Sequence, residues 1–244
     1  MGQPGSLGLI LLSLLLTYRS ILQNSELCIG LTYFLVGECF QFLQFFWIED
    51  CSSSWNQYLT ALSFFHVSFQ PVFTQLIVCG LLSSEKRTHH RKLLLLSSLS
   101  CFLYSCRYLL ADETSVVRGN QSNEWFRGNT VCTATGRSSV AWSMLLRSSD
   151  YILPNHYNFF FWSFIPFLLA PSSLWLYGVT FYLVTSAGST WWTTNIFEQP
   201  PVVSSLSLLT HAILVRLFLW TRLSSPNLDT IDEEQENQED YDYD

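Results

Sequence analysis

The stretch that decides the fold is residues 59–82, LTALSFFHVSFQPVFTQLIVCGLL, which contains no Asp, Glu, Lys or Arg. A helix needs about 20 apolar residues to cross a bilayer, so this stretch is long enough to do so. His66, Gln70 and Thr74 recur at i, i+4 and i+8, which predicts one polar stripe along the helix. An ionisable ring at membrane depth is a functional hypothesis by default, so His66 marks a buried polar interior.

The composition of the whole chain is that of a membrane protein with an acidic tail. Of its 244 residues, 49% are hydrophobic and only 13% are charged, about half the roughly 25% found in soluble domains. The formal net charge of -7 comes from the tail, because nine of the nineteen acidic residues lie in 229–244. We predict one transmembrane domain over 1–223 and a disordered extension over 224–244, either a solvated tail or a docking element for a protein partner.

Apolar runs along the chain predict an all-α fold, a polytopic bundle of about seven transmembrane helices. The first run either remains as an anchor or is a cleaved signal peptide, which would leave six spans. It lacks a basic segment before the run, and its only charge, Arg19, follows the run, which favours the anchor. The predicted spans are residues 6–22, 27–48, 56–83, 92–111, 156–170, 173–192 and 202–222.

The loop predicted over residues 83–92, SSEKRTHHRK, carries the strongest concentration of basic residues. Basic loops remain in the cytoplasm, so this loop places the N-terminus outside and the C-terminus in the cytoplasm. The 112–155 loop is then extracytoplasmic, which agrees with its N-glycosylation sequon at Asn120. Cys51 and Cys132 fall in loops on that same side, where they either form a disulfide or stay as two thiols.

A second buried ionisable group, Glu38, lies in the second predicted span, with Gln41 three residues later. A carboxylate in hydrocarbon needs a partner or a proton, and the neighbouring spans offer His66 and Arg107. Glu38 and His66 lie at similar depth in antiparallel helices, so they form a proton relay, a cargo site or a structural hydrogen bond. His211 in the last span either completes a site with them or is a core residue. The predicted polar pocket comprises Glu38, Gln41, His66, Gln70, Thr74, Arg107 and His211.

The leading functional prediction is a protein that binds or conducts a small solute or protons, without a cofactor. The first alternative is a membrane hydrolase with zinc bound by Glu38, His66 and His211. The second is a structural protein that docks a partner through the acidic tail. The chain lacks the GxSxG, HExxH, P-loop and GxGxxG signatures, which argues against the corresponding enzymes. We expect the lipid bilayer as a partner and no nucleic acid.

The chain contains the short motifs His66-Val-Ser-Phe69-Gln70-Pro71, Cys132-Thr133 with Gly136, Ala141-Trp142, Phe164-Ile165-Pro166-Phe167 and Glu198-Gln199-Pro200. Together these motifs resemble an uncharacterised family, a domain of unknown function found in small polytopic membrane proteins. The resemblance covers roughly residues 28 to 222. It implies six or seven helices and supplies no activity, substrate or cofactor. We predict Glu198 itself to be a solvated surface acid.

The seven-helix hydrolases of the alkaline-ceramidase and adiponectin-receptor superfamily provide a second comparison. Their pattern includes an HxxxH pair in the last helix. In this chain His211 is followed four residues later by Val215, so the pair is missing. This departure argues against the hydrolase alternative.

Overall fold

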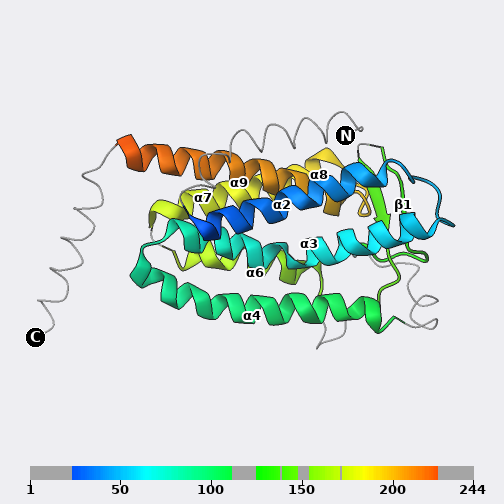
Figure 1. Cartoon of the computed structure of the whole chain (residues 1–244), viewed down its shortest axis with the longest axis horizontal. Helices are drawn as coiled ribbons and strands as arrows, with labels where there is room; N and C mark the ends of the chain where they lie inside the picture. Colours follow the sequence, from blue (N-terminus) through cyan, green and yellow to red (C-terminus); the bar gives the residue numbers. More distant parts are fainter. Residues whose placement is uncertain (1–23, 112–124, 138, 148–153, 171, 225–244) are drawn as a thin grey trace, which may run out of the picture.

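The computed structural model describes residues 24–111, 125–137, 139–147, 154–170 and 172–224, which form a bundle of helices with a small β-hairpin at one end (Figure 1). The predicted first span, the sequon at Asn120 and the acidic tail from residue 225 onward lie outside these residues. The helical elements are α2 (Ser25–Gln44), α3 (Ser54–Leu81), α4 (Ser84–Leu109), α6 (His156–Leu168), α7 (Ser172–Tyr182), the π-helical turn η1 (Leu183–Ala187), α8 (Gly188–Trp192) and α9 (Gln199–Ser224).

Three of these helices are long and apolar enough to cross a membrane: α2, α3 and residues Gln199–Thr221 of α9. They correspond to the predicted spans 27–48, 56–83 and 202–222. The central helix is α3, because 72% of its apolar window is buried inside the protein, against 39% for α2 and 56% for α9. It packs against α2, α4 and α6, so polar side chains on its different faces lie against different neighbouring helices.

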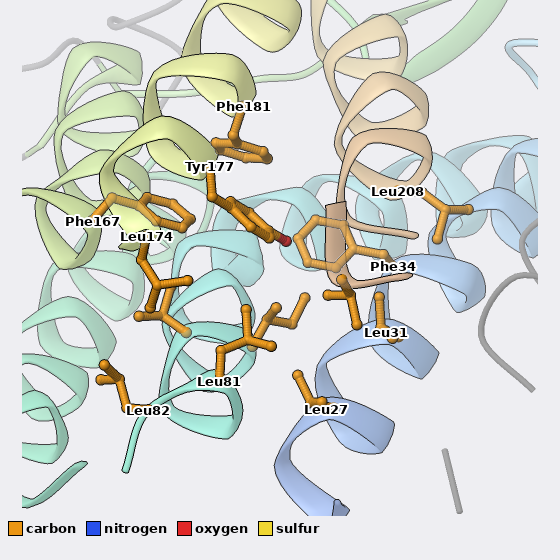
Figure 2. Close-up of a cluster of buried hydrophobic side chains, with 13 residues drawn as sticks. Leu27, Leu31, Phe34, Leu81, Leu82, Phe167, Leu174, Tyr177, Phe181 and Leu208 are labelled. Atoms are coloured by element: carbon orange, nitrogen blue, oxygen red, sulfur yellow. The ribbon is translucent and has the colours of Figure 1, made fainter. Parts of the chain in front are cut away.

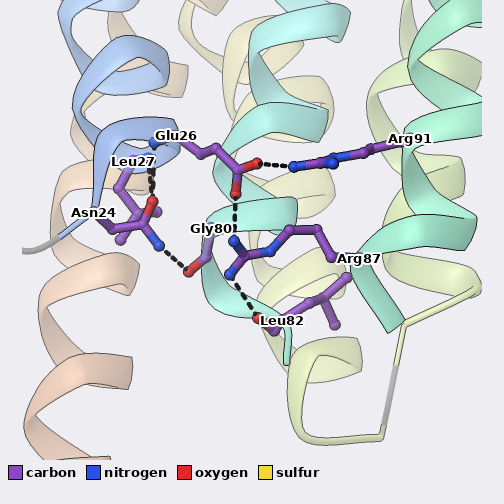
Figure 3. A network of polar contacts seen from close by, with 7 residues as sticks. All are labelled: Asn24, Glu26, Leu27, Gly80, Leu82, Arg87 and Arg91. Carbon is purple, nitrogen blue, oxygen red and sulfur yellow. Dashed lines mark hydrogen bonds and ion pairs between the residues drawn. The ribbon is translucent and has the colours of Figure 1, made fainter. Parts of the chain in front are cut away.

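Residues Ser84–Lys92 form the first turns of α4, so the prediction of a loop over 83–92 was wrong. Lys and Arg are good helix formers, and a helix can begin before its apolar part does. Glu26 at the start of α2 pairs with Arg87 and Arg91, each at 3.4 Å, and Arg87 also donates to the Leu82 carbonyl at 3.2 Å (Figure 3). The basic end of α4 is thereby attached to the start of α2.

Asn24 connects the start of α2 to the end of α3. Its side-chain oxygen accepts from the backbone N–H of Glu26 at 2.9 Å and of Leu27 at 3.4 Å, an N-cap that satisfies donors left free by the helix. Its amide donates to the Gly80 carbonyl at 3.0 Å (Figure 3). Next to this contact, an apolar core fills the bundle between α2, α3, α6, α7 and α9 (Figure 2). Its labelled members are Leu27, Leu31, Phe34, Leu81, Leu82, Phe167, Leu174, Tyr177, Phe181 and Leu208.

The opposite end of the bundle carries a two-stranded antiparallel sheet, which the all-α prediction did not include. Strand β1 (Cys132–Thr135) pairs with β2 (Val140–Ser143). Strands of four residues are too short for their alternation to stand out in a sequence. We call residues 125–137 and 139–147 the cap.

The cap closes the bundle with a second apolar core. Trp142 is 1% exposed and its ring stacks on Phe126 with centroids 5.8 Å apart. The other buried members are Phe64, Val67, Tyr104, Trp125, Val140, Met144, Leu146, Phe159 and Val203. Because these residues come from helices as well as from the cap, the cap is part of the folded body.

Candidate functional site

A polar seam runs between α2, α3 and α9 in the interior of the bundle. Glu38 and Gln41 are three residues apart, Gln70 and Thr74 four, and Ser204 and His211 seven, so each pair lies on one face of its helix. All of them are buried. The seam consists of Glu38 and Gln41 on α2, Gln70 and Thr74 on α3, and Ser204, Ser205 and His211 on α9.

Glu38 is the centre of the seam and is completely buried. Its Oε1 accepts from the hydroxyl of Ser205 at 2.8 Å and from the amide of Gln41 at 3.4 Å. Within the described part of the chain, Oε2 has no hydrogen-bond partner, and no basic side chain forms an ion pair with this carboxyl group. A buried carboxylate without a cation is strongly unfavourable, so the site favours the protonated, neutral form.

Gln70 lies at the same level as Glu38 but comes from α3. Its amide donates to the hydroxyl of Ser204 at 2.7 Å. Its Oε1 is buried and has no partner among the described residues. Ser204 and Ser205 are consecutive, so their positions differ by only about 1.5 Å along the axis of α9. Two incompletely bonded side chains are therefore held by adjacent serines.

His211 continues the seam two helical turns farther along α9. Its Nε2 lies 3.3 Å from the hydroxyl of Thr74, and its Nδ1 lies 2.7 Å from the hydroxyl of Tyr177 on α7. Both ring nitrogens are thus engaged, and a neutral imidazole needs one of these hydroxyls as a donor and the other as an acceptor. Tyr177, Ser204 and Ser205 were not predicted; the spacing of Ser204 and His211, seven residues apart, was the available signal.

His66 does not join this seam. Its Nε2 donates to the backbone carbonyl of Tyr33 at 2.7 Å, while the Tyr33 hydroxyl donates to the His66 carbonyl at 2.7 Å. The two rings stack with centroids 4.1 Å apart. The expected pairing of Glu38 with His66 is not formed, because consecutive residues on a helix point about 100° apart: Gly37 faces His66, whereas Glu38 faces α9.

Gly37 makes room for the His66 ring, which gives a direct test of this contact. A Cβ at residue 37 would lie 2.9 Å from Nδ1 and closer still to Cε1. We expect Gly37→Ala to destabilise the protein by about 1–3 kcal/mol, since the ring must leave its stack on Tyr33. Thermal unfolding in detergent measures the effect. Gly188→Ala is the control, because the nearest side-chain atom to a Cβ there lies 3.4 Å away. Equal melting temperatures for the two variants would contradict this packing.

Arg107 was predicted to line the pocket, but its guanidinium bonds to the backbone of Arg147 and Pro154 instead. The guanidinium is buried and donates to the carbonyl of Arg147 through Nε at 2.9 Å, and to that of Pro154 through Nη1 at 3.3 Å. These carbonyls flank residues 148–153. Arg107 therefore links the end of the cap at Arg147 to Pro154 just before α6, a structural role that its sequence position in an apolar helix did not reveal.

The cap closes the end of the seam through Trp142 and Gln44. The indole N–H of Trp142 donates to Gln44 Oε1 at 2.8 Å, and the Gln44 amide donates to the hydroxyl of Ser63 at 2.9 Å. Asn56 pairs with both backbone groups of Thr133, accepting from its N–H at 2.8 Å and donating to its carbonyl at 2.9 Å. Asn56 therefore acts on β1 like an additional strand residue.

Cys51 and Cys132, predicted to face the same side, are joined by a disulfide. Beside it, Glu49 adopts a φ of 69°, and its carboxylate accepts from the backbone N–H of Thr135 at 2.6 Å. Hydrogen bonds from Thr135, above all this one, lower the pKa of Glu49 because they favour the charged form. The connection between α2 and α3 is thus bonded to β1 both covalently and through hydrogen bonds.

Glu198 is buried against the cap, so the prediction of a solvated acid was wrong. Its exposed fraction is 1%, and its Oε1 accepts from the backbone N–H of Arg137 at 2.8 Å and from the amide of Asn195 at 3.0 Å. A Cβ at Gly136 would overlap the Glu198 carboxyl group, so glycine is needed there. The carboxyl group thus accepts hydrogen bonds both from the cap and from the segment just before α9.

The residues proposed for zinc do not converge. Among the residues that the structure describes, no group of three or more His, Cys, Asp or Glu side chains is arranged to hold a metal ion. Glu38, His66 and His211 are engaged by Ser205, Tyr33 and Tyr177 respectively. The geometry therefore does not support the hydrolase alternative.

Comparison with known proteins places the chain in a family but assigns it no activity. No curated protein and no solved structure matches it. Several motif residues that suggested an uncharacterised family meet at the cap, where Gly136 contacts Glu198 and the backbone N–H of Trp142 donates to the Phe197 carbonyl at 2.9 Å. A family model confirms that suggestion, and the chain belongs to the family of unknown function DUF5765, which matches residues 5–224.

Proposed function

We propose that the protein is a multi-pass integral membrane protein that binds protons at Glu38 and conducts them along the polar seam. The observation that carries this proposal is a completely buried carboxyl group with one unpartnered oxygen and no cation beside it in the described chain. Such a group is neutral when protonated and strongly destabilised when charged. It therefore exchanges a proton only with its hydrogen-bonded neighbours or with water that reaches it.

The exposed apolar side chains on the remaining helices support the multi-pass arrangement. α4, α6 and α7 each present large apolar side chains to the outside of the bundle, and contact with lipid explains this exposure better than contact with water. With the first predicted span at 6–22, the arrangement comprises seven spans. The exposed residues include Leu95, Leu99, Phe102 and Leu109 on α4, Phe161 and Leu168 on α6, and Trp175 and Leu176 on α7.

The two ends of the bundle differ in a way that supports the predicted orientation. The disulfide of Cys51 with Cys132 lies at the cap end, and disulfides persist in oxidising compartments. Arg87 and Arg91 lie at the other end, beside the start of α2. Basic residues are retained on the cytoplasmic side, so the cap faces outward in this proposal.

The close packing of the seam favours protons over a larger solute. Its side chains are hydrogen-bonded in small groups, with distances of 2.7–3.4 Å, and protons pass between hydrogen-bonded groups without a solute-sized channel. A cavity of about 10 Å³ lies elsewhere, between α3, α4 and α6, with Ser68, Cys101 and Asn158 among its lining residues. It has room for about one water molecule and does not include Glu38.

Proton flux in liposomes tests the proposal. Liposomes containing the protein and a trapped pH dye should lose an imposed pH gradient faster than empty liposomes do. In Glu38→Gln the rate should fall to that of empty liposomes, because the amide cannot exchange the proton. Glu49→Gln is the matched control, since Glu49 lies in the connection beside the cap. An unchanged rate in Glu38→Gln, or a wild-type rate equal to that of empty liposomes, would overturn the proposal.

A further inference from the structure

We infer that the seam also binds one sodium ion, held between Glu38 of α2 and Gln70 of α3 at the level of Ser204 and Ser205. This inference rests on the proposed role of Glu38, because the sodium ion and the proton are alternative occupants of the same carboxyl group. It adds a ligand and a set of binding oxygens to that role.

The first argument comes from the two unpartnered oxygens. Glu38 Oε2 and Gln70 Oε1 are both buried acceptors without a donor in the described chain. The other polar atom of each side chain is held by one of two adjacent serines, at 2.8 Å for Glu38 and 2.7 Å for Gln70. Buried polar atoms normally have a partner, and one cation between two acceptors would supply a partner for both.

The second argument is the chemistry of the available atoms. The side chains at this level of the seam offer a carboxylate, an amide carbonyl and two serine hydroxyls. The backbone carbonyl of Pro201 lies one helical turn away and already accepts from Gln41 at 3.3 Å. These are hard oxygen ligands, which suit alkali and alkaline-earth cations and not the softer transition metals.

The third argument concerns charge and size. Glu38 is the one acid among the seam residues, so a monovalent cation gives a neutral site, whereas a divalent cation would leave a net charge in an apolar environment. The side chains pack closely at this level, since the Glu38 carboxyl group lies 2.8 Å from the Ser205 hydroxyl and the Gln70 amide nitrogen lies 2.7 Å from the Ser204 hydroxyl. Close packing favours the smaller sodium ion over potassium.

Gln75 provides a matched control on the same helix. Its Oε1 is also buried and unpartnered among the described residues, but its amide donates to the Trp162 carbonyl of α6 at 3.2 Å. Five residues separate it from Gln70, so the two side chains point about 140° apart on α3. Gln75→Met thus removes the same chemical group from the other face of the helix.

Proton release on addition of salt tests the inference. Purified protein in detergent, weakly buffered and containing a pH dye, should release about one proton per chain when sodium chloride is added, because one carboxyl group exchanges one charge. Choline chloride at equal ionic strength should release none. Glu38→Gln should abolish the release, and Gln70→Met should weaken sodium binding about tenfold or more. Gln75→Met should match the wild type.

Each outcome separates this inference from the proposed function. Glu38-dependent proton flux without sodium-dependent release would overturn the sodium site and leave proton conduction intact. Sodium-dependent proton release without proton flux would overturn proton conduction and leave the sodium site intact. Equal sodium affinity in Gln70→Met and Gln75→Met would also overturn the site. If Gln70→Met does not fold, melting temperatures of the other two proteins test the site. Sodium must raise the melting temperature of the wild type and must not raise that of Glu38→Gln.

Discussion

Replacing Trp142 by alanine is expected to destabilise the protein by roughly 3–5 kcal/mol, the usual range for removing a fully buried aromatic side chain. The substitution removes the stack on Phe126 and leaves the side-chain oxygen of Gln44 without the indole donor. That oxygen is buried, so its lost hydrogen bond adds to the effect of the cavity. Equilibrium unfolding in mixed detergent micelles, followed by tryptophan fluorescence, measures the change.

The control for Trp142→Ala is Trp191→Ala, because Trp191 is 86% exposed. We expect this variant to unfold at nearly the same denaturant concentration as the wild type. Limited proteolysis provides a second measurement, since a loosened cap exposes backbone that the hairpin now protects. The buried position of the indole would be contradicted if Trp142→Ala unfolded at the same denaturant concentration as Trp191→Ala and resisted proteolysis equally well.

Removing the disulfide is expected to have the second largest effect. Cys51 and Cys132 are separated by 81 positions in sequence, and cross-linking a loop of that length stabilises a protein by about 4 kcal/mol, mainly by restricting the unfolded chain. The double variant Cys51→Ser with Cys132→Ser should therefore melt at a clearly lower temperature than the wild type. Differential scanning calorimetry in detergent, with and without reductant, measures the difference.

Two comparisons make the disulfide prediction specific. Reductant should lower the melting temperature of the wild type toward that of the double variant and leave the double variant unchanged. Cys39→Ser is the matched control, because Cys39 is a free, exposed cysteine. If reductant shifts the double variant as much as the wild type, or leaves both unchanged, the Cys51–Cys132 bridge does not hold the cap.

The positions of the helices were largely predictable, because a helix that is long and apolar enough to cross a membrane can be recognised in the sequence by its length and apolar composition. The run at 59–82 became most of α3, and Glu38 and Gln41 were correctly placed on one helix face. The start of α4 was missed because hydropathy identifies the apolar part of a helix and not its basic first turns. The hairpin was missed because Cys132–Thr135 and Val140–Ser143 are too short to show a strand pattern.

The candidate site was predicted in part, because a sequence shows which residues share a face but not which helix lies opposite. Glu38 was expected to meet His66 on the next helix; its partner is Ser205, 167 positions away in sequence. Serine is common in such helices and gave no distinctive signal. Gln70 and Thr74 did share a stripe, but His66 turned toward Tyr33 because the stripe drifts about 40° with each four-residue step.

The position of the disulfide has a consequence for the order of assembly. Residues 51 to 132 form a covalent ring that contains all of α3 and α4. During synthesis Cys51 therefore cannot form its disulfide until both helices have been made, because its partner Cys132 lies in β1, which follows α4 in the sequence. Until then, nothing covalent joins the connection between α2 and α3 to β1, and contacts such as Gly37 against His66 and Gln44 with Ser63 hold this helix pair together. The disulfide of the cap therefore forms late, after the helices that it encloses have packed together.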